Sequence, residues 1–371
     1  MKKIVITGGH LTPSLLVIDE LKKRGDWQIF YLGRKHATEG DRTLSWEAKM
    51  VPKKGVIFLP LFAGRLQQKM TRYTFFAFLR IPFGFLQALY YLLRIKPDVV
   101  LAFGSYVSVP VVISAWFLRI PVLSHQQTLV KGKADKINSR LAKKVAVSWS
   151  RSLEEPPKDK KVLTGLPFRQ DIFKARKKLP PFLKIDPKLP LILITGGNQG
   201  SHFINLAVEG TLRKLLQRYN IFHQTGSLKD SADFNYLKEI RNKLPEKLKQ
   251  RYYLETFLTG SLWPRILNKA DLIVSRAGVN TIIELLALEK PSLLIPIPWL
   301  FNDEQTVNAH MLKNLGLAEV LNQDDLNSDN LYNLIEKMMG EIDSYKIVDQ
   351  QKESLITNAA EKITDELEKL A

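Results

Sequence analysis

The chain has 371 residues, of which 45% are hydrophobic and 25% charged, a length and composition that suit two globular domains. It contains no cysteine, which excludes disulfides, thiolate metal sites and cysteine nucleophiles. The net charge of +18 lies entirely in residues 1–170, because residues 171–371 carry 26 basic and 26 acidic side chains. A cationic first half predicts an anionic partner: nucleic acid, a phosphorylated ligand or an acidic membrane.

Short apolar runs alternate with amphipathic stretches, a pattern typical of βα units and a mostly parallel sheet. The N-terminal run has too few apolar residues before its glycines to be a signal peptide, so it is expected to be a buried strand. A helix is expected at 13–24, with Gly25 as its stop. The strands expected in the first half are residues 3–7, 28–32, 99–103, 121–124, 145–148 and 162–164.

Residues 48–97 contain no acidic side chain but nine Lys or Arg among many large apolar ones. Cations beside clustered Phe and Leu are typical of a segment at a membrane interface. A buried helix pair with solvated basic edges is the alternative. Pro82 and Gly84 predict a loop between two helices. The expected membrane patch comprises Arg72, Phe75, Phe76, Phe78, Arg80, Phe83 and Phe85.

Residues 99–118 form an uncharged run of twenty, long enough to span a bilayer. Gly104, Ser108 and Pro110 interrupt the run, which predicts a buried strand, a glycine turn and the start of a helix. We therefore do not expect it to span a membrane.

A second series of elements follows a proline-rich joint at 180–190. Its opening, 194–198, matches 6–10, which predicts two Rossmann-like units with a cleft between them. A last amphipathic helix, roughly 348–370, is expected to pack back on the first unit. The second series is expected to contain strands 191–195, 221–224, 271–275 and 292–296 and helices 201–218, 262–269 and 279–288.

Three loops that join a strand to a helix through glycine, at 7–10, 103–108 and 195–201, could hold phosphate on free N–H groups. None contains the Gly-Lys-Ser/Thr of a P-loop or a full G-x-G-x-x-G, so a nicotinamide cofactor is disfavoured.

The most informative segment is 275–285, where a strand ends, Gly278 turns the chain and a helix begins near Val279. Its first amides and the Thr281 hydroxyl could hold a diphosphate, and Glu284 could accept hydrogen bonds from two ribose hydroxyls. Downstream, Gln305 could contact sugar hydroxyls while Asn308 closes the turn. The alternative is a plain βα turn with a surface glutamate.

In these residues and their order along the chain, the sequence resembles the MurG family of bacterial N-acetylglucosaminyltransferases over nearly its whole length. The resemblance rests on Thr7–His10 with Pro13, Phe103–Ser108, His125–Gln127, Thr164–Arg169, Thr195–Ser201, Ser275–Glu284, Gln305 and Asn308-Ala309, all in the family's order. Three departures stand out: a different start to the first loop, His125-Gln126-Gln127-Thr128 in place of His-Glu-Gln-Asn, and Asn198 in place of serine.

The resemblance implies an α/β GT-B fold, with an acceptor- and membrane-binding domain at 1–165 joined by helix 346–371, and a UDP-sugar domain at 166–345. It implies transfer of GlcNAc from UDP-GlcNAc to a polyprenyl-diphosphate-linked muramoyl-peptide, converting lipid I to lipid II in peptidoglycan synthesis. The expected location is peripheral, on the cytoplasmic face of the cell membrane, against an anionic surface and without nucleic acid.

The site residues that the resemblance implies fall into two groups. The acceptor diphosphate is expected at the first two glycine loops, with Gly104, Ser105 and Tyr106. The UDP-sugar is expected at Thr7, Gly8, Gly9, Thr128, Arg169, Asn198, Leu258, Val279, Asn280, Thr281, Glu284 and Gln305.

The favoured mechanism is an inverting displacement with no cofactor and no metal. No Asp-x-Asp ends a strand, so the charge of the departing diphosphate is expected to fall on the helix at Val279 and on Arg169. His10 is the leading candidate for the base. In the alternative, its only role is to donate a hydrogen bond to the acceptor phosphate. His125 is the second candidate, with a structural role as its alternative.

Two other functions remain open at this point. The enzyme could glycosylate diacylglycerol or another polyprenyl-diphosphate sugar, or the chain could be a non-catalytic homologue that binds nucleotide-sugar or lipid. Nucleic-acid binding would suit the charge, but the aromatic residues cluster with aliphatic ones and no binding motif is present.

Overall fold

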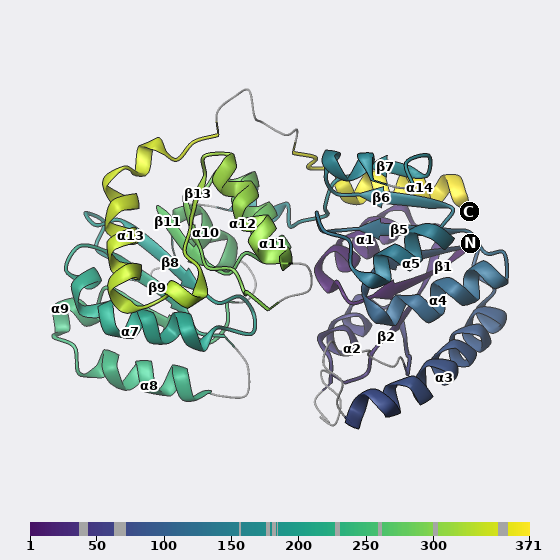
Figure 1. Cartoon of the computed structure of the whole chain (residues 1–371), viewed down its shortest axis with the longest axis horizontal. Coiled ribbons are helices and arrows are strands. Elements are labelled where there is room, and N and C mark those ends of the chain that lie inside the picture. The colour runs from purple at the N-terminus through teal and green to yellow at the C-terminus, as the bar shows by residue number, and fades with distance from the viewer. Residues whose placement is uncertain are drawn as a thin grey trace. The chain divides into compact units, whose positions relative to one another are not determined.

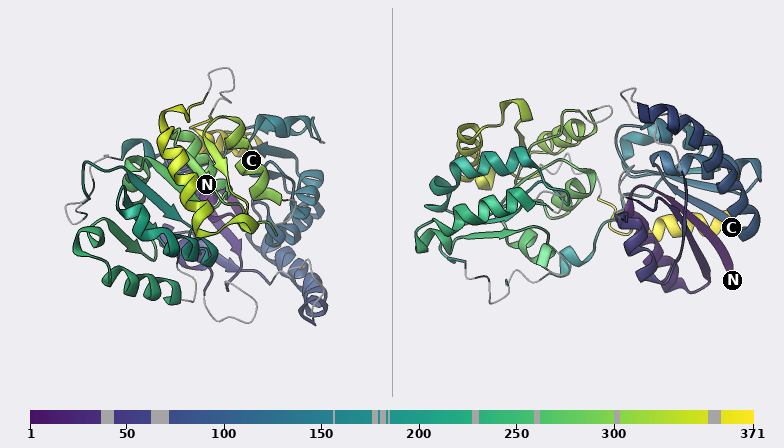
Figure 2. Two further views of the ribbon diagram at one scale, coloured as in Figure 1. Left: turned by 60° about the vertical axis from the view of Figure 1, so that its left-hand side comes forward. Right: turned by 90° about the horizontal axis from the view of Figure 1, so that it is seen from below.

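The computed structural model folds into two compact units, residues 1–168 with 356–371, and residues 169–355. The boundaries expected at 165 and 345 lie three and ten residues before these divisions. Each unit has its own sheet with helices packed on both faces (Figures 1 and 2). The structure describes all residues except 37–43, 63–71, 156, 176–178, 180–182, 184, 227–230, 259–261, 300–302 and 348–354, and no side chains of 72–81 and 231.

The first unit contains a seven-stranded parallel sheet in the order β3-β2-β1-β4-β5-β6-β7. The strand order reverses between β1 and β4, which creates a crevice-forming switch point at their carboxyl ends. The strands are β1 Lys2–Gly8, β2 Trp27–Gly33, β3 Ile57–Pro60, β4 Val99–Phe103, β5 Val122–Gln126, β6 Lys144–Val147 and β7 Lys161–Leu163. The helices are α1 Leu11–Arg24, α2 Trp46–Met50, α3 Arg72–Ile95, α4 Ser105–Phe117, α5 Lys133–Leu141 and α14 Ala359–Leu370.

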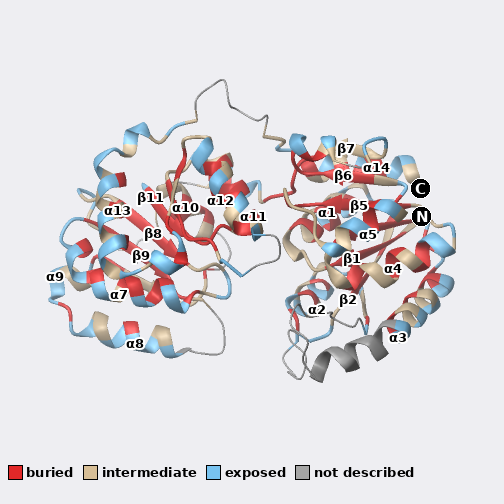
Figure 3. Cartoon of the chain, viewed as in Figure 1, coloured by how far each residue is buried: buried red, intermediate tan, exposed pale blue. Residues whose placement is uncertain are grey.

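Alternate side chains of the central strands fill two cores, one on each face of this sheet. The central strands are accordingly coloured as buried in Figure 3. On β1, Ile4 and Ile6 join a cluster that includes side chains of α1 and α14. Val5 joins the opposite cluster, which is covered by α3 and α4. Both faces are therefore apolar, which explains the continuous hydrophobic runs in these strands.

The C-terminal helix α14 packs on the first unit, against α1. Ile363 and Leu367 are fully buried in the core that α1 lines. At the rim, Arg24 Nη2 lies 2.8 Å from Asp365 Oδ1, and its Nη1 lies 2.9 Å from Glu368 Oε2. The chain thus returns from the second unit to complete the core of the first.

The prediction of a loop at Pro82 and Gly84 was wrong, because α3 runs through both residues as one helix. Proline removes one helical hydrogen bond and costs roughly 3 kcal/mol inside a helix. The buried face of the following turns, formed by Gly84, Ala88 and Leu92, packs into the core and offsets this cost.

The prediction for residues 99–118 is confirmed, since β4, Gly104 and α4 follow one another there. Among the helices that the structure describes, none is long and apolar enough to cross a bilayer.

The second unit has a six-stranded parallel sheet in the order β10-β9-β8-β11-β12-β13, with the same reversal between β8 and β11. Side chains of α7 and α13 cover one face as a single core cluster. The strands are β8 Leu191–Thr195, β9 Asn220–Gln224, β10 Tyr252–Glu255, β11 Leu272–Ser275, β12 Ser292–Leu294 and β13 Ala318–Val320. The helices are α6 Asp171–Lys174, α7 His202–Leu216, α8 Ser231–Asn242, α9 Glu246–Lys249, α10 Leu262–Lys269, α11 Val279–Ala287, α12 Glu304–Asn314 and α13 Ser328–Gly340.

Three edge strands were not predicted from the sequence: β3, β10 and β13. Each is only three or four residues long and most of its positions are partly exposed. β10 and β13 each contain a glutamate, since an edge strand with one neighbour does not need the uninterrupted apolar run that identifies a central strand. β3 is apolar throughout, but it lies in the acid-free segment 48–97, which was interpreted as a membrane interface or a helix pair.

Candidate active site

The first two glycine loops contact each other at the carboxyl edge of the first sheet, because β1 and β4 are adjacent. A Cβ on Gly8 would lie 2.9 Å from Phe103 Cβ, and one on Gly9 would lie 2.7 Å from Ser105 Oγ. Gly8 also has a φ of +138°, which side chains rarely permit. Packing and backbone geometry thus require glycine here, and the amino ends of α1 and α4 converge.

The start of α4 has an unusual backbone, with φ of +64° at Gly104 and +67° at Ser105. A non-glycine residue in this region costs on the order of 1–3 kcal/mol and often marks a ligand site. Ser108 Oγ donates to Ser105 O at 2.8 Å, and Asn138 Nδ2 of α5 donates to Ser108 Oγ at 2.7 Å. The side chain of Tyr106 packs partly into the core under α4.

His10 occupies the N-cap position of α1, but its side chain makes no capping hydrogen bond. Burial, and then the positive charge of Arg34, lower the pKa of this imidazole to about 4. At neutral pH the ring is therefore uncharged and keeps a nitrogen lone pair, as a general base must. The low pKa also makes it a weaker base than a free histidine.

His125 at the end of β5 is only 1% exposed. Its Nε2 lies 3.2 Å from Gly165 O and 3.3 Å from Ser148 Oγ, and its ring packs against Phe103 at 5.3 Å between centroids. Burial lowers its pKa to about 4. This enclosure favours the structural role over that of base.

Several buried polar atoms at this edge have no hydrogen-bond partner among the described residues: Thr7 Oγ1, His125 Nδ1 and both amide atoms of Gln127. Buried polar groups are nearly always satisfied in folded proteins, so this concentration suits a ligand that supplies the partners. Thr128 is held locally, since its Oγ1 donates to Val130 O at 2.8 Å.

In the second unit, the third glycine loop is fixed by Gln224 of β9. The Gln224 Nε2 donates to Gly197 O at 3.0 Å, and its Oε1 accepts from the Leu258 amide at 3.1 Å. Two of the expected donor contacts, the loop of the exposed Asn198 and Leu258, are thereby tied together. Ser201 then caps α7.

The loop after β11 turns at Gly278 into α11. Asn308 Nδ2 donates to Ala277 O at 3.1 Å, which confirms that Asn308 closes this turn. Gln305 Oε1 accepts from the Ile297 amide at 3.1 Å, while its Nε2 lies 4.0 Å from the position of a Cβ on Gly278. Gln305 therefore sits beside the amino end of α11.

Glu284 lies on the second turn of α11 and is 8% exposed, so the alternative of a surface glutamate is wrong. Trp263 Nε1 donates to Glu284 Oε2 at 2.9 Å. Burial raises the pKa of this carboxyl to about 7, against the opposing effects of Trp263 and Arg169. Arg169 itself is paired with Asp171 at 2.6 Å.

The remaining expected donor residues lie along the same helix. The Val279 side chain is buried, those of Asn280 and Thr281 are half-buried, and Asn280 Oδ1 has no partner in the described part of the chain.

Arg276 was assigned no role from the sequence, and the structure buries it between the starts of α7 and α11. Its Nη2 donates to Ser201 Oγ at 2.7 Å and to Gln323 Oε1 at 2.6 Å, and its Nη1 donates to Ile295 O at 3.0 Å. Burial lowers its pKa to about 10, so it stays protonated at neutral pH. One buried cation thus joins the starts of α7 and α11.

Of the expected membrane patch, Phe83 is 69% exposed and Phe85 is half-buried. The side chains of Arg72, Phe75, Phe76, Phe78 and Arg80 lie outside the described residues. The structure adds exposed apolar residues that the sequence did not single out: Leu86, Tyr90 and Leu93 on α3, and Trp116 and Phe117 on the adjacent α4. The positions 83, 86, 90 and 93 form one stripe along α3.

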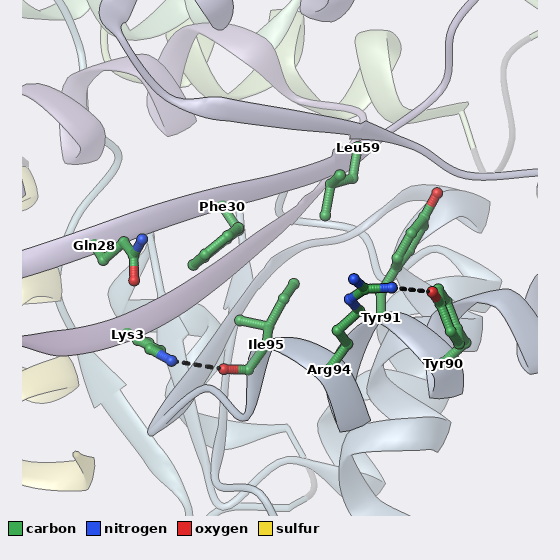
Figure 4. Close-up of a pocket in the computed structure, with 8 residues that line it drawn as sticks. All are labelled: Lys3, Gln28, Phe30, Leu59, Tyr90, Tyr91, Arg94 and Ile95. Carbon is green, nitrogen blue, oxygen red and sulfur yellow. Dashed lines mark hydrogen bonds between the residues drawn. The ribbon is translucent and has the colours of Figure 1, made fainter.

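A cavity of about 420 Å³ lies between the C-terminal half of α3 and strands β1–β3 (Figure 4). It is lined by Lys3, Gln28, Phe30, Leu59, Tyr90, Tyr91, Arg94 and Ile95. Lys3 Nζ donates to Ile95 O at 3.2 Å and Arg94 Nη1 to Tyr90 Oη at 2.7 Å. Lys3 and Gln28 begin their strands, so the cavity lies away from the glycine loops.

Two parallel sheets, each with a glycine loop at the point where its strand order reverses, form the GT-B architecture. The glycosyltransferase family 28 N-terminal domain matches residues 7–147, and the family's C-terminal domain matches residues 191–367. The chain therefore belongs to glycosyltransferase family 28, and within it to the MurG family.

Two curated relatives carry the name UDP-N-acetylglucosamine--N-acetylmuramyl-(pentapeptide) pyrophosphoryl-undecaprenol N-acetylglucosamine transferase. The relative from Bacillus cereus, whose name ends in "transferase 2", is 34% identical over 93% of this chain and 94% of its own length. The one from Clostridium kluyveri is 32% identical over 100% of this chain and 99% of its own.

Solved structures agree on the fold. MurG of Acinetobacter baumannii superposes with a TM-score of 0.71 at 24% identity, covering both chains fully. The calicheamicin glycosyltransferase CalG4 gives 0.69 at 14% identity over 100% of this chain and 98% of its own.

The packing of the third glycine loop against Thr225 can be tested by substituting its glycines. A Cβ on Gly200 would lie 2.0 Å from Thr225 O, whereas one on Gly197 would meet nothing within 4 Å, although both have positive φ. We expect Gly200→Ala to lower the free energy of unfolding by about 3 kcal/mol or more, through overpacking and strain. Gly197→Ala should cost only about 1 kcal/mol, from strain alone. Urea unfolding checks both, and equal losses would contradict the packing.

Proposed function

We propose that this glycosyltransferase moves GlcNAc from UDP-GlcNAc to the lipid-linked muramoyl-peptide acceptor, converting lipid I to lipid II with inversion at the anomeric carbon. The names of its full-length relatives support the donor and the acceptor. The observation that carries the proposal is the arrangement at α11, where a free helix start, Gln305 and the buried Glu284 lie around Gly278.

The donor would bind with its diphosphate at the amino ends of α7 and α11 and its ribose at Glu284. A helix amino end contributes up to about 2 kcal/mol to binding an anion. Two helix starts joined by the Arg276 guanidinium would therefore act together on the same phosphates. Glu284, held by Trp263, would accept hydrogen bonds from ribose hydroxyls when ionised.

The chemistry proposed needs no metal. The acceptor oxygen attacks the anomeric carbon, the bond to the UDP oxygen breaks, and its electron pair leaves with the diphosphate. Fixed N–H dipoles and Arg276 would stabilise that charge without reorganising. Arg169 would add to this stabilisation, and in the free protein it is paired with Asp171. His10, uncharged at neutral pH, would accept the proton of the acceptor hydroxyl.

The acceptor lipid would reach the first unit from a membrane, on the cytoplasmic face. The stripe of Phe83, Leu86, Tyr90 and Leu93 supports a peripheral contact, since exposed apolar patches of this kind mark interaction surfaces. The net charge of +18 in residues 1–170 favours an anionic lipid surface.

Turnover tests the proposal directly. Purified protein with UDP-GlcNAc and a short-chain lipid I analogue should yield the disaccharide product, with and without EDTA. Product from diacylglycerol instead would support the rival glycolipid synthase. No product from any acceptor, with UDP-GlcNAc still bound, would support a non-catalytic homologue.

Glu284→Gln should weaken UDP-GlcNAc binding about tenfold or more at pH 8, since hydrogen bonds to a charged group contribute roughly 1.5–3 kcal/mol each. Because the carboxyl has a pKa of about 7, the wild-type affinity should fall as the pH drops below 7, while the variant stays flat. Calorimetry measures both. The exposed Glu239→Gln is the matched control, and an unchanged affinity in Glu284→Gln would remove Glu284 from the donor site.

The double variant Phe83→Ser, Leu86→Ser should lower binding to phosphatidylglycerol vesicles at least tenfold, because each side chain buries apolar surface worth roughly 1.5–3 kcal/mol. Tyr236→Ser is the control, since this exposed aromatic lies on α8 in the other unit. Vesicle sedimentation measures the bound fraction. Full retention of the double variant would contradict the membrane contact.

A further inference from the structure

The carboxyl group of Asp135 lies against the backbone of the second glycine loop. Its Oδ1 is 2.6 Å from the position that a Cβ on Gly104 would take, so any side chain at 104 would displace it. Its Oδ2 accepts a hydrogen bond from the Gly132 amide at 3.2 Å. Among the described residues, Oδ1 has no hydrogen-bond partner, and the residue keeps partial solvent exposure.

The same helix braces the rest of this loop. Asn138, one turn after Asp135, donates to Ser108 Oγ, which in turn bonds the Ser105 carbonyl. The Oδ1 atom of Asn138 is fully buried and has no partner in the described part of the chain. The first two turns of α5 therefore hold the strained start of α4 in place and present an acid beside it.

We propose that Asp135 binds the acceptor diphosphate as a neutral carboxylic acid, donating a hydrogen bond from Oδ1 to a phosphate oxygen. This inference rests on the proposed function and on the expectation that the acceptor diphosphate binds at the second glycine loop, with Gly104, Ser105 and Tyr106. A carboxylate would repel the phosphate, whereas the acid is a donor. Acceptor binding then takes up one proton from solvent, which resides on Asp135 until the product leaves.

The surroundings of Asp135 suit this role. Burial raises the pKa of the carboxyl to about 6, against the opposing effects of the Gly132 amide and of Lys131. The titratable groups on the packed elements are Tyr106 of α4 and His125 of β5, and neither is a carboxyl group. About a tenth of the free protein thus carries the proton at pH 7, and a bound phosphate raises that fraction.

The affinity for the acceptor should therefore decrease as the pH rises. The acceptor binds the protonated form, so its affinity is greatest below pH 6 and falls up to tenfold per pH unit above it. The diphosphate of lipid I is esterified at both ends, so it has no proton that dissociates in this pH range. His10 titrates near 4, well below it. Glu284, with a pKa of about 7, belongs to the proposed donor site, and saturating UDP-GlcNAc removes its effect from the acceptor KM. A loss of acceptor affinity above pH 6 that disappears in Asp135→Asn therefore reports on Asp135.

The test compares wild type with Asp135→Asn. The amide keeps an oxygen for the Gly132 N–H and donates at every pH. With saturating UDP-GlcNAc, the wild-type KM for a short-chain lipid I analogue should rise at least tenfold from pH 6.5 to 8. In Asp135→Asn it should stay flat and lie below the wild-type value at pH 8. Asp159→Asn, at an exposed position, should match wild type.

A second readout detects the proton itself. Binding heats of the lipid I analogue at pH 7.5, measured in two buffers of different ionisation enthalpy, should show uptake of nearly one proton by wild type and none by Asp135→Asn. A variant that keeps the wild-type pH profile, or whose KM rises at pH 8, overturns this inference alone. Absence of turnover and of acceptor binding in wild type overturns the proposed function and this inference with it.

Discussion

Two pairs of parallel strands determine where the glycine loops lie, β1 with β4 in the first unit and β8 with β11 in the second. The strand order reverses at each pair, so the helices that follow its two strands lie on opposite faces of the sheet, while in the first unit the two glycine loops stay in contact at the sheet edge. Register aligns Gly8 with Phe103 and Thr195 with Ser275. A slip of one residue would turn every side chain of a strand to the wrong face, so the buried cores enforce these alignments.

Much of this arrangement could be predicted from the sequence, because its determinants are local. A central strand such as Val99–Phe103 is buried on both faces, and its apolar run shows this directly. A glycine after such a strand predicts the turn into a helix, as at Gly278. The resemblance to the MurG family then orders these motifs, and the fold and the family follow from them.

What could not be predicted depends on partners far apart in the chain. Pro82 is tolerated inside α3 because the face beyond it is buried against strands and α4. Arg276 matters because Ser201 and Gln323, 75 and 47 residues away, accept its hydrogen bonds. Asp135 looks like an ordinary first-turn acid of a helix until packing sets it against Gly104.

Burial shifts the charged groups of both sites toward their neutral forms, with pKa values of about 7 for Glu284, 6 for Asp135 and 10 for Arg276. The protonated form of Asp135 repels an incoming diphosphate less than an ionised carboxylate would. In residues 171–371 the net charge is zero, so attraction for a nucleotide there must come from local fields, the helix starts and Arg276. The excess charge of the first 170 residues is therefore not needed to bind the nucleotide. It is free to act on an extended anionic surface, and this gives the proposed division of donor and membrane binding between the two units a physical basis.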